Sequence, residues 1–304
     1  MRAAAISDGV WPTMITPFKL TGEVDYAALE LLIEWYMDQG VHGLFAVCQS
    51  SEMFFLTLEE RVRIARFVKE KAAGRIQVIA SGHTSDDLEE QIHELAQIAS
   101  TGVDAVVLVT NRLAKENESE EVWLERAQKL LDALPDTAFG LYECPYPYKR
   151  LLSPQVLKWC AASGRFLFLK DTSCDTEQIN DKLKAVAGSG LKLFNANSTT
   201  LLASLRQGAS GFSGVMANFH PSLYVKLVEE WKNDEKGAEK LQAFLTVASF
   251  IELQMYPVNA KVHLQQLGLP ITTYCRSRDA SAFKPNHRLE VEQLELLAGI
   301  IKEL

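Results

Sequence analysis

The chain has 304 residues, with 31 lysines and arginines against 39 aspartates and glutamates, so its formal net charge is −8 at pH 7. This acidic balance argues against nucleic acid and anionic membrane surfaces as main partners, because both are polyanions. Hydrophobic residues make up 47% of the chain and charged residues 23%, as in ordinary globular proteins rather than disordered or fibrous ones.

The N-terminal sequence MRAAAISDGVWPTM contains one arginine and no long apolar run. We therefore expect neither a signal peptide nor a membrane-spanning helix, and we predict a cytoplasmic protein. The five cysteines include no CxxC pair, which argues against a disulfide framework or a structural zinc site. The six histidines include no HxH or HExxH pair, so the sequence predicts no metal.

Short apolar segments rich in β-forming residues alternate with longer segments of helical periodicity. Helix-start signals lie at Asp25, at Thr57 with Glu60 as a capping box, and at Ser85. The eight predicted strands are Val10–Pro17, Leu44–Cys48, Gln77–Ser81, Ala105–Thr110, Phe139–Cys144, Phe166–Asp171, Lys192–Ala196 and Gly211–Met216.

A glycine recurs where a helical pattern gives way to a strand, at Gly40, Gly102 and Gly208. Each suits the left-handed position just past a helix. Alternating strands and helices, with nearly continuous apolar strands, imply a parallel sheet covered by helices. Eight such units predict an α/β fold, a (β/α)8 TIM barrel, with an open doubly wound sheet as the alternative. No GxGxxG or GxxxxGK[ST] follows a strand, which weakens the nucleotide-binding form of that alternative.

After Pro221 the pattern becomes wholly helical, which is more than one crossover requires. We therefore expect the barrel over residues 1–220 and a C-terminal helical region over residues 221–304. The predicted helices of this region are Ser222–Asn233, Glu235–Met255, Val258–Leu267 and Leu289–Leu304.

In a β/α barrel the reacting groups stand at the C-terminal ends of the strands. Lys170 ends an apolar strand, where lost hydration lowers the pKa of an amine and favours attack on a carbonyl. Tyr142 ends the preceding strand and can relay a proton, and the turn at Ser50 can hold a carboxylate through its hydroxyl and backbone N–H groups. Each has a structural alternative: a lysine reaching water, an aromatic side chain capping the barrel, and a plain turn.

Taken together, Glu52 after the second strand, Tyr142 and Pro145 after the fifth, and Lys170 at the end of the sixth resemble the dihydrodipicolinate synthase and N-acetylneuraminate lyase family of pyruvate-dependent class I aldolases. The resemblance runs over nearly the whole chain, from Gly9 to the helical tail. It includes the sequence GFSGVMAN at residues 211–218, which is similar to the family's eighth-strand segment.

The resemblance implies that Lys170 forms an imine with the keto carbon of pyruvate and that Tyr142 shuttles protons. It implies a pyruvate or 2-keto acid substrate, no cofactor beyond the covalent imine, and a homo-oligomer built as a dimer of dimers. The turn after the second strand would hold the pyruvate carboxylate. The residues expected to bind substrate are Gln49, Ser50, Ser51, Gly214, Val215, Asn195 and Arg112.

The chain departs from the family pattern in the turn and in the proton relay. Where relatives have Gly-Thr/Ser-Thr-Gly-Glu, residues 48–52 read CQSSE, so Ser50 keeps one hydroxyl but Gln49 loses the one that belongs to the synthase relay. Where the synthase has a tyrosine pair after the fourth strand, residues 110–115 read TNRLAK. The relay between subunits is therefore expected to be absent in its usual form.

The chain also departs from the family at the second-substrate pocket. The position of the synthase arginine that grips aspartate semialdehyde is taken by Pro147. Arg150 and Arg112 are the candidates to compensate from a loop, but a displaced arginine rarely reproduces the bidentate geometry. After the seventh strand, residues 195–198 read NANS instead of the family's Gly-Asp or Gly-Tyr-Asp patterns. The pocket beyond pyruvate is therefore expected to be particular to this protein.

These observations predict a Schiff-base lyase that condenses pyruvate with an aldehyde or cleaves a 2-keto-4-hydroxy acid. Three alternatives stay open. The same enamine can expel a hydroxyl, as in a keto-deoxy sugar-acid dehydratase; the chain can be a true dihydrodipicolinate synthase; or it can be a barrel that binds a 2-keto acid without turning it over.

Overall fold

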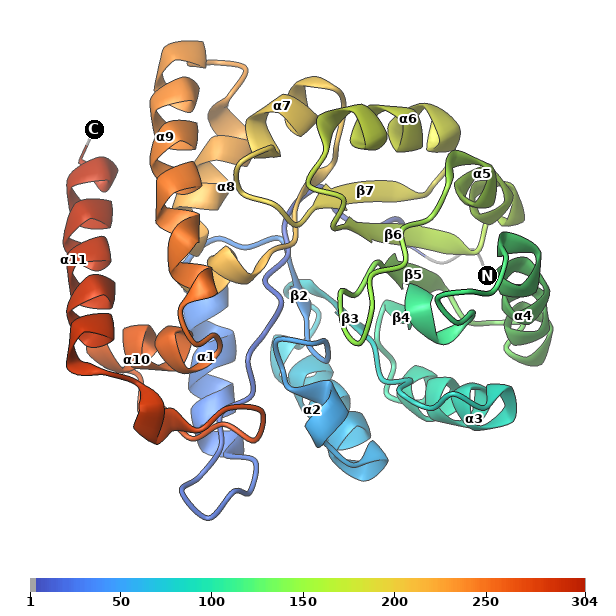
Figure 1. Cartoon of the computed structure of the whole chain (residues 1–304), viewed down its shortest axis with the longest axis horizontal. Coiled ribbons are helices and arrows are strands. Elements are labelled where there is room, and N and C mark those ends of the chain that lie inside the picture. Colours follow the sequence, from blue (N-terminus) through green and yellow to red (C-terminus); the bar gives the residue numbers. More distant parts are fainter. Residues whose placement is uncertain (1–3, 304) are drawn as a thin grey trace.

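The computed structural model describes residues 4–303, which form a (β/α)8 barrel followed by additional helices (Figure 1). The parallel strands lie in the order β1-β8-β7-β6-β5-β4-β3-β2, and a bridge between Thr13 and Phe45 closes the ring. The predicted fold class is confirmed. The strands are β1 (Gly9–Val10), β2 (Gly43–Phe45), β3 (Gln77–Ala80), β4 (Ala105–Val109), β5 (Phe139–Tyr142), β6 (Phe166–Asp171), β7 (Lys192–Asn195) and β8 (Gly211–Phe212).

Helices alternate with the strands and then continue alone at the C-terminal end (Figure 1). The α-helices are α1 (Tyr26–Asp38), α2 (Leu58–Ala72), α3 (Leu88–Ala99), α4 (Glu120–Ala133), α5 (Pro154–Ser163), α6 (Thr176–Val186), α7 (Leu201–Arg206), α8 (Pro221–Glu230), α9 (Glu235–Ala248), α10 (Val258–Gln266) and α11 (Pro285–Lys302). Helix α8 packs against β1 and α9 packs against α8. The division of the chain at residue 220 stays a prediction, because no break in packing marks it.

The local start and stop signals explain most helix ends. The Asp25 side chain accepts from the backbone N–H of Ala28, and Thr57 with Glu60 forms a complete capping box. The predicted start of the third helix at Ser85 is wrong: the cap is Asp87, whose carboxylate accepts two backbone N–H groups in the first turn. A carboxylate is the stronger cap here because it also faces the positive end of the helix dipole.

The three glycines at the helix-to-strand junctions adopt the expected left-handed conformation. Their φ angles are 78° at Gly40, 79° at Gly102 and 103° at Gly208. Residues with a Cβ atom rarely adopt these angles, so a glycine lets the chain reverse directly into the next strand.

Several predicted elements are longer than the observed ones. The first strand ends at Val10 rather than Pro17, since Pro12 and Pro17 carry no N–H and, beyond Val10, the segment pairs with β2 through an isolated bridge at Thr13. The second strand ends at Phe45, although backbone hydrogen bonds to the β3 segment continue as far as Val47. The eighth ends at Phe212, before the 3-10 helix η3 (Val215–Asn218). The predicted helix Glu235–Met255 is interrupted after Ala248, where the chain continues as the 3-10 helix η4 (Ser249–Leu253).

The C-terminal helices also differ at their ends. The segment predicted from Leu289 begins four residues earlier, at Pro285, because proline is well suited to the first turn of a helix. Its predicted end at Leu304 lies outside the described residues. None of the helices within residues 4–303 is both long and apolar enough to cross a membrane. All five cysteines are free thiols, and Cys174 is the exposed one.

Aromatic side chains fill the barrel interior. The rings of Phe168 and Phe194 stack with centroids 4.5 Å apart, and Trp11 and Phe45 pack against Phe168 at 5.6 Å and 6.1 Å. Phe168 precedes Lys170 by two residues on β6, so both side chains lie on the same face of the strand. The apolar layer therefore lies directly beneath the lysine.

Candidate active site

Lys170 stands at the C-terminal end of β6 and is 4% exposed. Its Nζ atom donates to the backbone oxygen of Ser213 and lies 5.2 Å from the centroid of the Tyr142 ring. Burial among apolar groups lowers the pKa of Lys170 from 10.5 to about 8, because the charged form loses hydration. An appreciable fraction of the amine is therefore neutral near pH 7, the form that attacks a carbonyl.

Tyr142 lies beside Lys170 because the two residues are register partners on β5 and β6. Its hydroxyl donates to Oε1 of Gln49 over 3.3 Å, and the Cys144 thiol contacts the same oxygen at 3.4 Å. Burial raises the pKa of Tyr142 well above 10, so the phenol holds its proton at neutral pH. Gln49 thus contacts both the Tyr142 hydroxyl and the Cys144 thiol from the turn after β2.

The turn after β2 is held by Ser51. The Ser51 hydroxyl accepts from the N–H of Cys48 and donates to the Cys48 carbonyl, both over 2.7 Å. Ser50 instead faces the cavity, where its hydroxyl donates to Oγ1 of Thr13 over 3.1 Å. The structure therefore brings Gln49 and Ser50 to the cavity, whereas the hydroxyl of Ser51 is already satisfied within the turn.

Glu52 adopts a left-handed conformation with φ of 63° and is 2% exposed. Its carboxylate forms an ion pair with the buried Lys261 at 3.1 Å. It also accepts the backbone N–H groups of Arg276 and Ser277, each at 2.7 Å. Glu52 thus ties the turn after β2 to a segment more than 200 residues later, which brings that segment to the mouth of the barrel.

The segment after β8 forms another side of the cavity, and Val215 lines it. A Cβ atom at Gly214 would lie 2.3 Å from the Phe212 ring and 2.5 Å from the carbonyl oxygen of Ala196. Only glycine permits this close approach between the end of β8 and the end of β7. Gly214 therefore shapes the cavity through its backbone, without a side chain to present to a ligand.

Two residues predicted to bind substrate are placed elsewhere. The fully buried Asn195 donates to the hydroxyls of Thr200 and Ser204 and caps the loop before α7. Arg112 pairs with Asp86 at 3.0 Å and lines a separate cavity on the side of α3 and α4. The structure does not bring these two side chains to Lys170, because each contacts a nearby loop, and their role in substrate binding stays a prediction.

The cavity above Lys170 has a volume of about 610 Å³ and is lined by residues from the barrel and from the C-terminal region. Sequence analysis missed the C-terminal contribution, since nothing in its local pattern marks it. The lining residues that it missed include Glu252, Leu253, Tyr256, Ser277 and Arg278, together with Phe54, Phe55, Tyr146 and Lys149.

Among the residues that were not predicted, Glu252 and Tyr256 carry ionisable groups that can transfer a proton. Burial raises the pKa of Glu252, while the charge of Lys170 opposes this shift. The Tyr256 hydroxyl accepts from Nδ2 of Asn218 at 3.0 Å, and burial raises the pKa of this tyrosine well above 10. Besides the predicted Lys170 and Tyr142, the cavity thus holds the carboxyl of Glu252 and the phenol of Tyr256.

A buried ionic cluster lies behind the reactive pair. Glu143 and Asp171 directly follow Tyr142 and Lys170 in the chain and point to the opposite face of their strands, as alternation requires. Lys182 of α6 bridges them, with Nζ 2.6 Å from Glu143 and 2.5 Å from Asp171. Burial raises the pKa of Glu143 to about 7, and the Lys182 charge opposes that shift. The cluster fixes the ends of β5 and β6 relative to each other.

Comparisons with known proteins agree with this geometry. The model of the dihydrodipicolinate synthetase family matches residues 6–295. A 4-hydroxy-tetrahydrodipicolinate synthase from Thermodesulfovibrio yellowstonii is 29% identical over 264 residues, covering 86% of this chain and 88% of the relative. The enzyme of the same name from Methanococcus aeolicus is 27% identical over 288 residues, covering 91% and 96%.

Solved structures share the fold. A dihydrodipicolinate synthase from Bacillus anthracis superposes with a TM-score of 0.87 at 21% identity, covering 96% of this chain and 98% of that chain. A prophage protein of the same family from E. coli K12, solved in complex with pyruvate, gives a TM-score of 0.85 at 23% identity, covering 98% and 99%. The chain therefore belongs to the dihydrodipicolinate synthetase family and is a pyruvate-dependent lyase of the Schiff-base type.

Proposed function

We propose that the neutral amine of Lys170 adds to the keto carbon of pyruvate. The adduct then loses water and becomes the imine through which the reaction proceeds. The observation that carries this proposal is a buried amine of lowered pKa at the floor of the cavity, beside a phenol. The imine withdraws electrons, so a methyl proton of pyruvate leaves and an enamine forms. The enamine carbon then attacks the aldehyde carbonyl, and water releases the 2-keto-4-hydroxy acid from Lys170; cleavage is the reverse.

In this proposal Tyr142 carries the protons. Its hydroxyl lies over the cavity, and Gln49 orients it through the 3.3 Å hydrogen bond. An amide accepts on oxygen and donates from nitrogen, so it does not pass a proton along as a hydroxyl does. Proton transfer then runs between substrate and Tyr142 alone, with no relay through the turn.

We further propose that the carboxylate of pyruvate lies at the Ser50 turn. Ser50 lines the cavity, where its hydroxyl donates to that of Thr13 and also lies within hydrogen-bonding reach of Tyr256. Hydroxyls and turn N–H groups are the donors that a carboxylate takes in a buried site. Binding there leaves the keto carbon directed at the amine.

The second substrate is proposed to be an aldehyde other than aspartate semialdehyde. Pro147 and Arg112 line the separate cavity, and Arg150 donates to the backbone oxygens of Lys115 and Glu118. The two candidate arginines, Arg150 and Arg112, are therefore engaged elsewhere. The cations that line the cavity besides Lys170 are Lys149 and Arg278, which suit an acidic group on the second substrate.

A keto-deoxy sugar-acid dehydratase remains a second candidate because of Glu252. This reaction expels a hydroxyl from the enamine and needs an acid to protonate it. Glu252 lines the same cavity as Lys170, and burial raises its pKa, which favours the acid role that this reaction needs. The family's usual setting also supports a cytoplasmic homo-oligomer, a dimer of dimers, which we propose for this chain.

Exchange of the pyruvate methyl protons in deuterium oxide tests the central proposal without knowledge of the aldehyde. We expect the methyl signal in the proton NMR spectrum to fade in the presence of the protein, because reversible enamine formation replaces hydrogen with deuterium. The matched control is Lys170→Ala, which should leave the signal at its buffer-only rate. Exchange no faster than in buffer would contradict the proposal and favour a barrel that only binds 2-keto acids.

Aspartate semialdehyde should be a poor substrate. Loss of one charge-assisted bond to its carboxylate costs about 1.5–3 kcal/mol, or roughly 10–150-fold in kcat/KM. Steady-state kinetics with pyruvate checks this expectation. A kcat/KM within the usual enzyme range of about 10⁴–10⁸ M⁻¹s⁻¹ would restore dihydrodipicolinate synthesis as the function.

Ser50→Ala should weaken pyruvate binding while scarcely changing thermal stability. The substitution removes one hydrogen bond to a charged group, worth about 1.5–3 kcal/mol, and the bond to Thr13 is a minor loss. Calorimetric titration of Lys170→Ala/Ser50→Ala against Lys170→Ala isolates this contact, since neither protein forms the imine. Equal affinities would place the carboxylate elsewhere in the cavity.

A further inference from the structure

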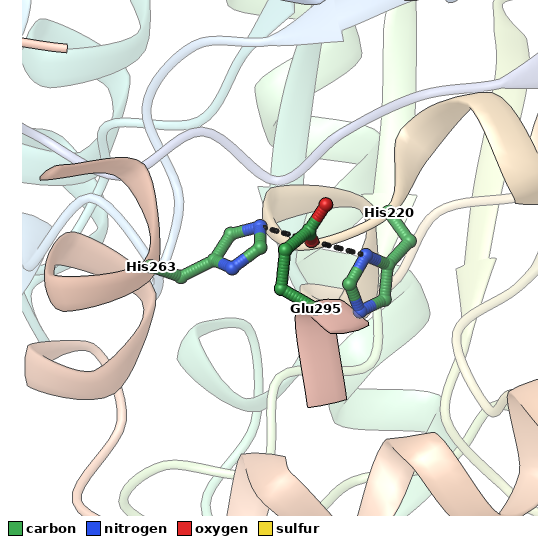
Figure 2. Close-up of side chains that lie close together, drawn as sticks. All are labelled: His220, His263 and Glu295. Atoms are coloured by element: carbon green, nitrogen blue, oxygen red, sulfur yellow. Dashed lines mark ion pairs between the residues drawn. The ribbon is translucent and has the colours of Figure 1, made fainter. Parts of the chain in front are cut away.

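Two histidines and a glutamate from three separate elements meet outside the active cavity (Figure 2). His220 is the residue before α8, His263 lies in α10 and Glu295 lies in α11. One ligand atom of each lies within 4.8 Å of the other two. The two histidines are 43 residues apart in the sequence, so no local motif reveals the cluster.

The cluster contains buried polar atoms that nothing in residues 4–303 satisfies. The side chain of His220 is fully buried, and both of its ring nitrogens lack a hydrogen-bond partner there. Oε2 of Glu295, which points between the two histidines, also lacks one (Figure 2). Buried polar groups in native proteins are almost always bonded, and an unexplained set facing one point is a sign of a missing ion or water.

The distances fit a shared ion better than direct hydrogen bonds. Nδ1 of His220 lies 3.5 Å from Oε2 of Glu295, and Nε2 of His263 lies 3.7 Å from the same oxygen. Hydrogen bonds of these types span about 2.7–3.2 Å. Two ligands on a tetrahedral zinc, with bonds of about 2.0–2.2 Å, lie roughly 3.3–3.6 Å apart.

We propose that His220, His263 and Glu295 bind a divalent transition-metal ion of the zinc class, which fastens α10 and α11 to the start of α8. Two imidazoles and one carboxylate are a usual donor set for zinc, and water completes the coordination. The ion is coordinated by one of the two unpartnered nitrogens of His220 and by the unpartnered oxygen of Glu295. Its role is structural, because none of the three residues lines the cavity above Lys170.

The surroundings set conditions on binding. Nε2 of His263 contacts the backbone oxygen of Phe219 at 2.8 Å, so this nitrogen exchanges that contact for the ion and carries no proton when the site is filled. Lys302 lies 3.8 Å from Oε1 of Glu295, the oxygen farther from the site, and holds the carboxylate from the outside.

The test uses the full chain, freed of metal by a chelator and titrated with Zn²⁺ by calorimetry and with Co²⁺ by visible absorption. We expect one ion per chain, a tetrahedral Co²⁺ spectrum, and a Tm that rises with Zn²⁺ concentration. Glu295→Gln preserves volume and should weaken Zn²⁺ binding by at least the roughly 10–100-fold that loss of a supporting group costs. Glu292→Gln, three residues earlier on α11, is the matched control and should bind as the parent does.

Two outcomes would overturn the proposal. If the parent protein takes up neither ion at micromolar concentration, the cluster is a set of polar groups without a metal. If Glu295→Gln and His263→Gln bind Zn²⁺ as tightly as the parent, the ion belongs to surface groups such as Cys174. Pyruvate exchange by the metal-free protein is expected to persist, so this test stands apart from that of the catalytic proposal.

Discussion

Lys170→Ala should abolish covalent capture of pyruvate. Incubation of the parent protein with pyruvate and borohydride is expected to add the mass of one reduced pyruvate per chain, on the peptide that contains Lys170. The reason is that reduction fixes the imine as a stable amine, and alanine offers no nitrogen to form it. Mass spectrometry of the digested protein measures both the extent and the place of labelling.

The control for this experiment is Lys149→Ala, which removes the other lysine of the cavity and should still be labelled. The rate of labelling should also rise with pH through about 8, because the attacking form of Lys170 is the neutral amine and its pKa lies there. At pH 7 roughly a tenth of the amine is neutral, and at pH 9 roughly nine tenths. Equal labelling of Lys170→Ala and the parent would refute the assignment.

Tyr142→Phe should slow turnover by about 10²–10⁴-fold, the usual contribution of a positioned acid or base. The change removes the hydroxyl that donates to Gln49 but keeps the ring that packs 5.8 Å from Phe45, so the fold and pyruvate affinity should survive. The rate of deuterium exchange into pyruvate gives the effect, and circular dichroism confirms the fold.

Tyr146→Phe provides the comparison, since Tyr146 lines the cavity but is half exposed and lies 4.9 Å from the Phe54 ring. It should retain most of the exchange rate. If Tyr142→Phe exchanged as fast as the parent, the proton would have to move through another group of the cavity, with Glu252 and Tyr256 as the available ones.

The sequence predicted the barrel because its signals are local and repeat eight times. Apolar runs such as Phe166–Asp171 and the junction glycines state the alternation of strand and helix directly. Strand ends were predicted poorly, since they depend on pairing: Val10 is the last paired residue of β1 only because Pro12 follows and the ring closes at Thr13. The apolar pattern of one strand does not indicate where the neighbouring strand that pairs with it ends.

The placement of Lys170 and Tyr142 at one cavity was predictable for the same reason, and the wall of that cavity was not. Lys170 and Tyr142 lie at the C-terminal ends of strands, where side chains of a β/α barrel lie close together. Asn195 also occupies a strand end, yet it turns to its own loop, a choice set by the nearby hydroxyls of Thr200 and Ser204. Glu252 lies in a segment that the sequence predicted as part of one continuous helix, and it reaches the cavity because the chain instead forms η4 there and packs over the barrel.

The link between Glu52 and the backbone of Arg276 and Ser277 bears on how proteins with this barrel diverge. It lets one stretch of chain hold the imine chemistry while a distant stretch supplies Glu252, Leu253 and Arg278 to the wall. Within that stretch the charge of Glu252 acts on Lys170, whereas Leu253 and Arg278 are not among the groups that most shift its pKa. Substitutions near the C-terminus can therefore change which aldehyde is accepted while the enamine chemistry is kept. We expect chimaeras joined between η3 and η4 to show the substrate preference of the parent that supplies the C-terminal part.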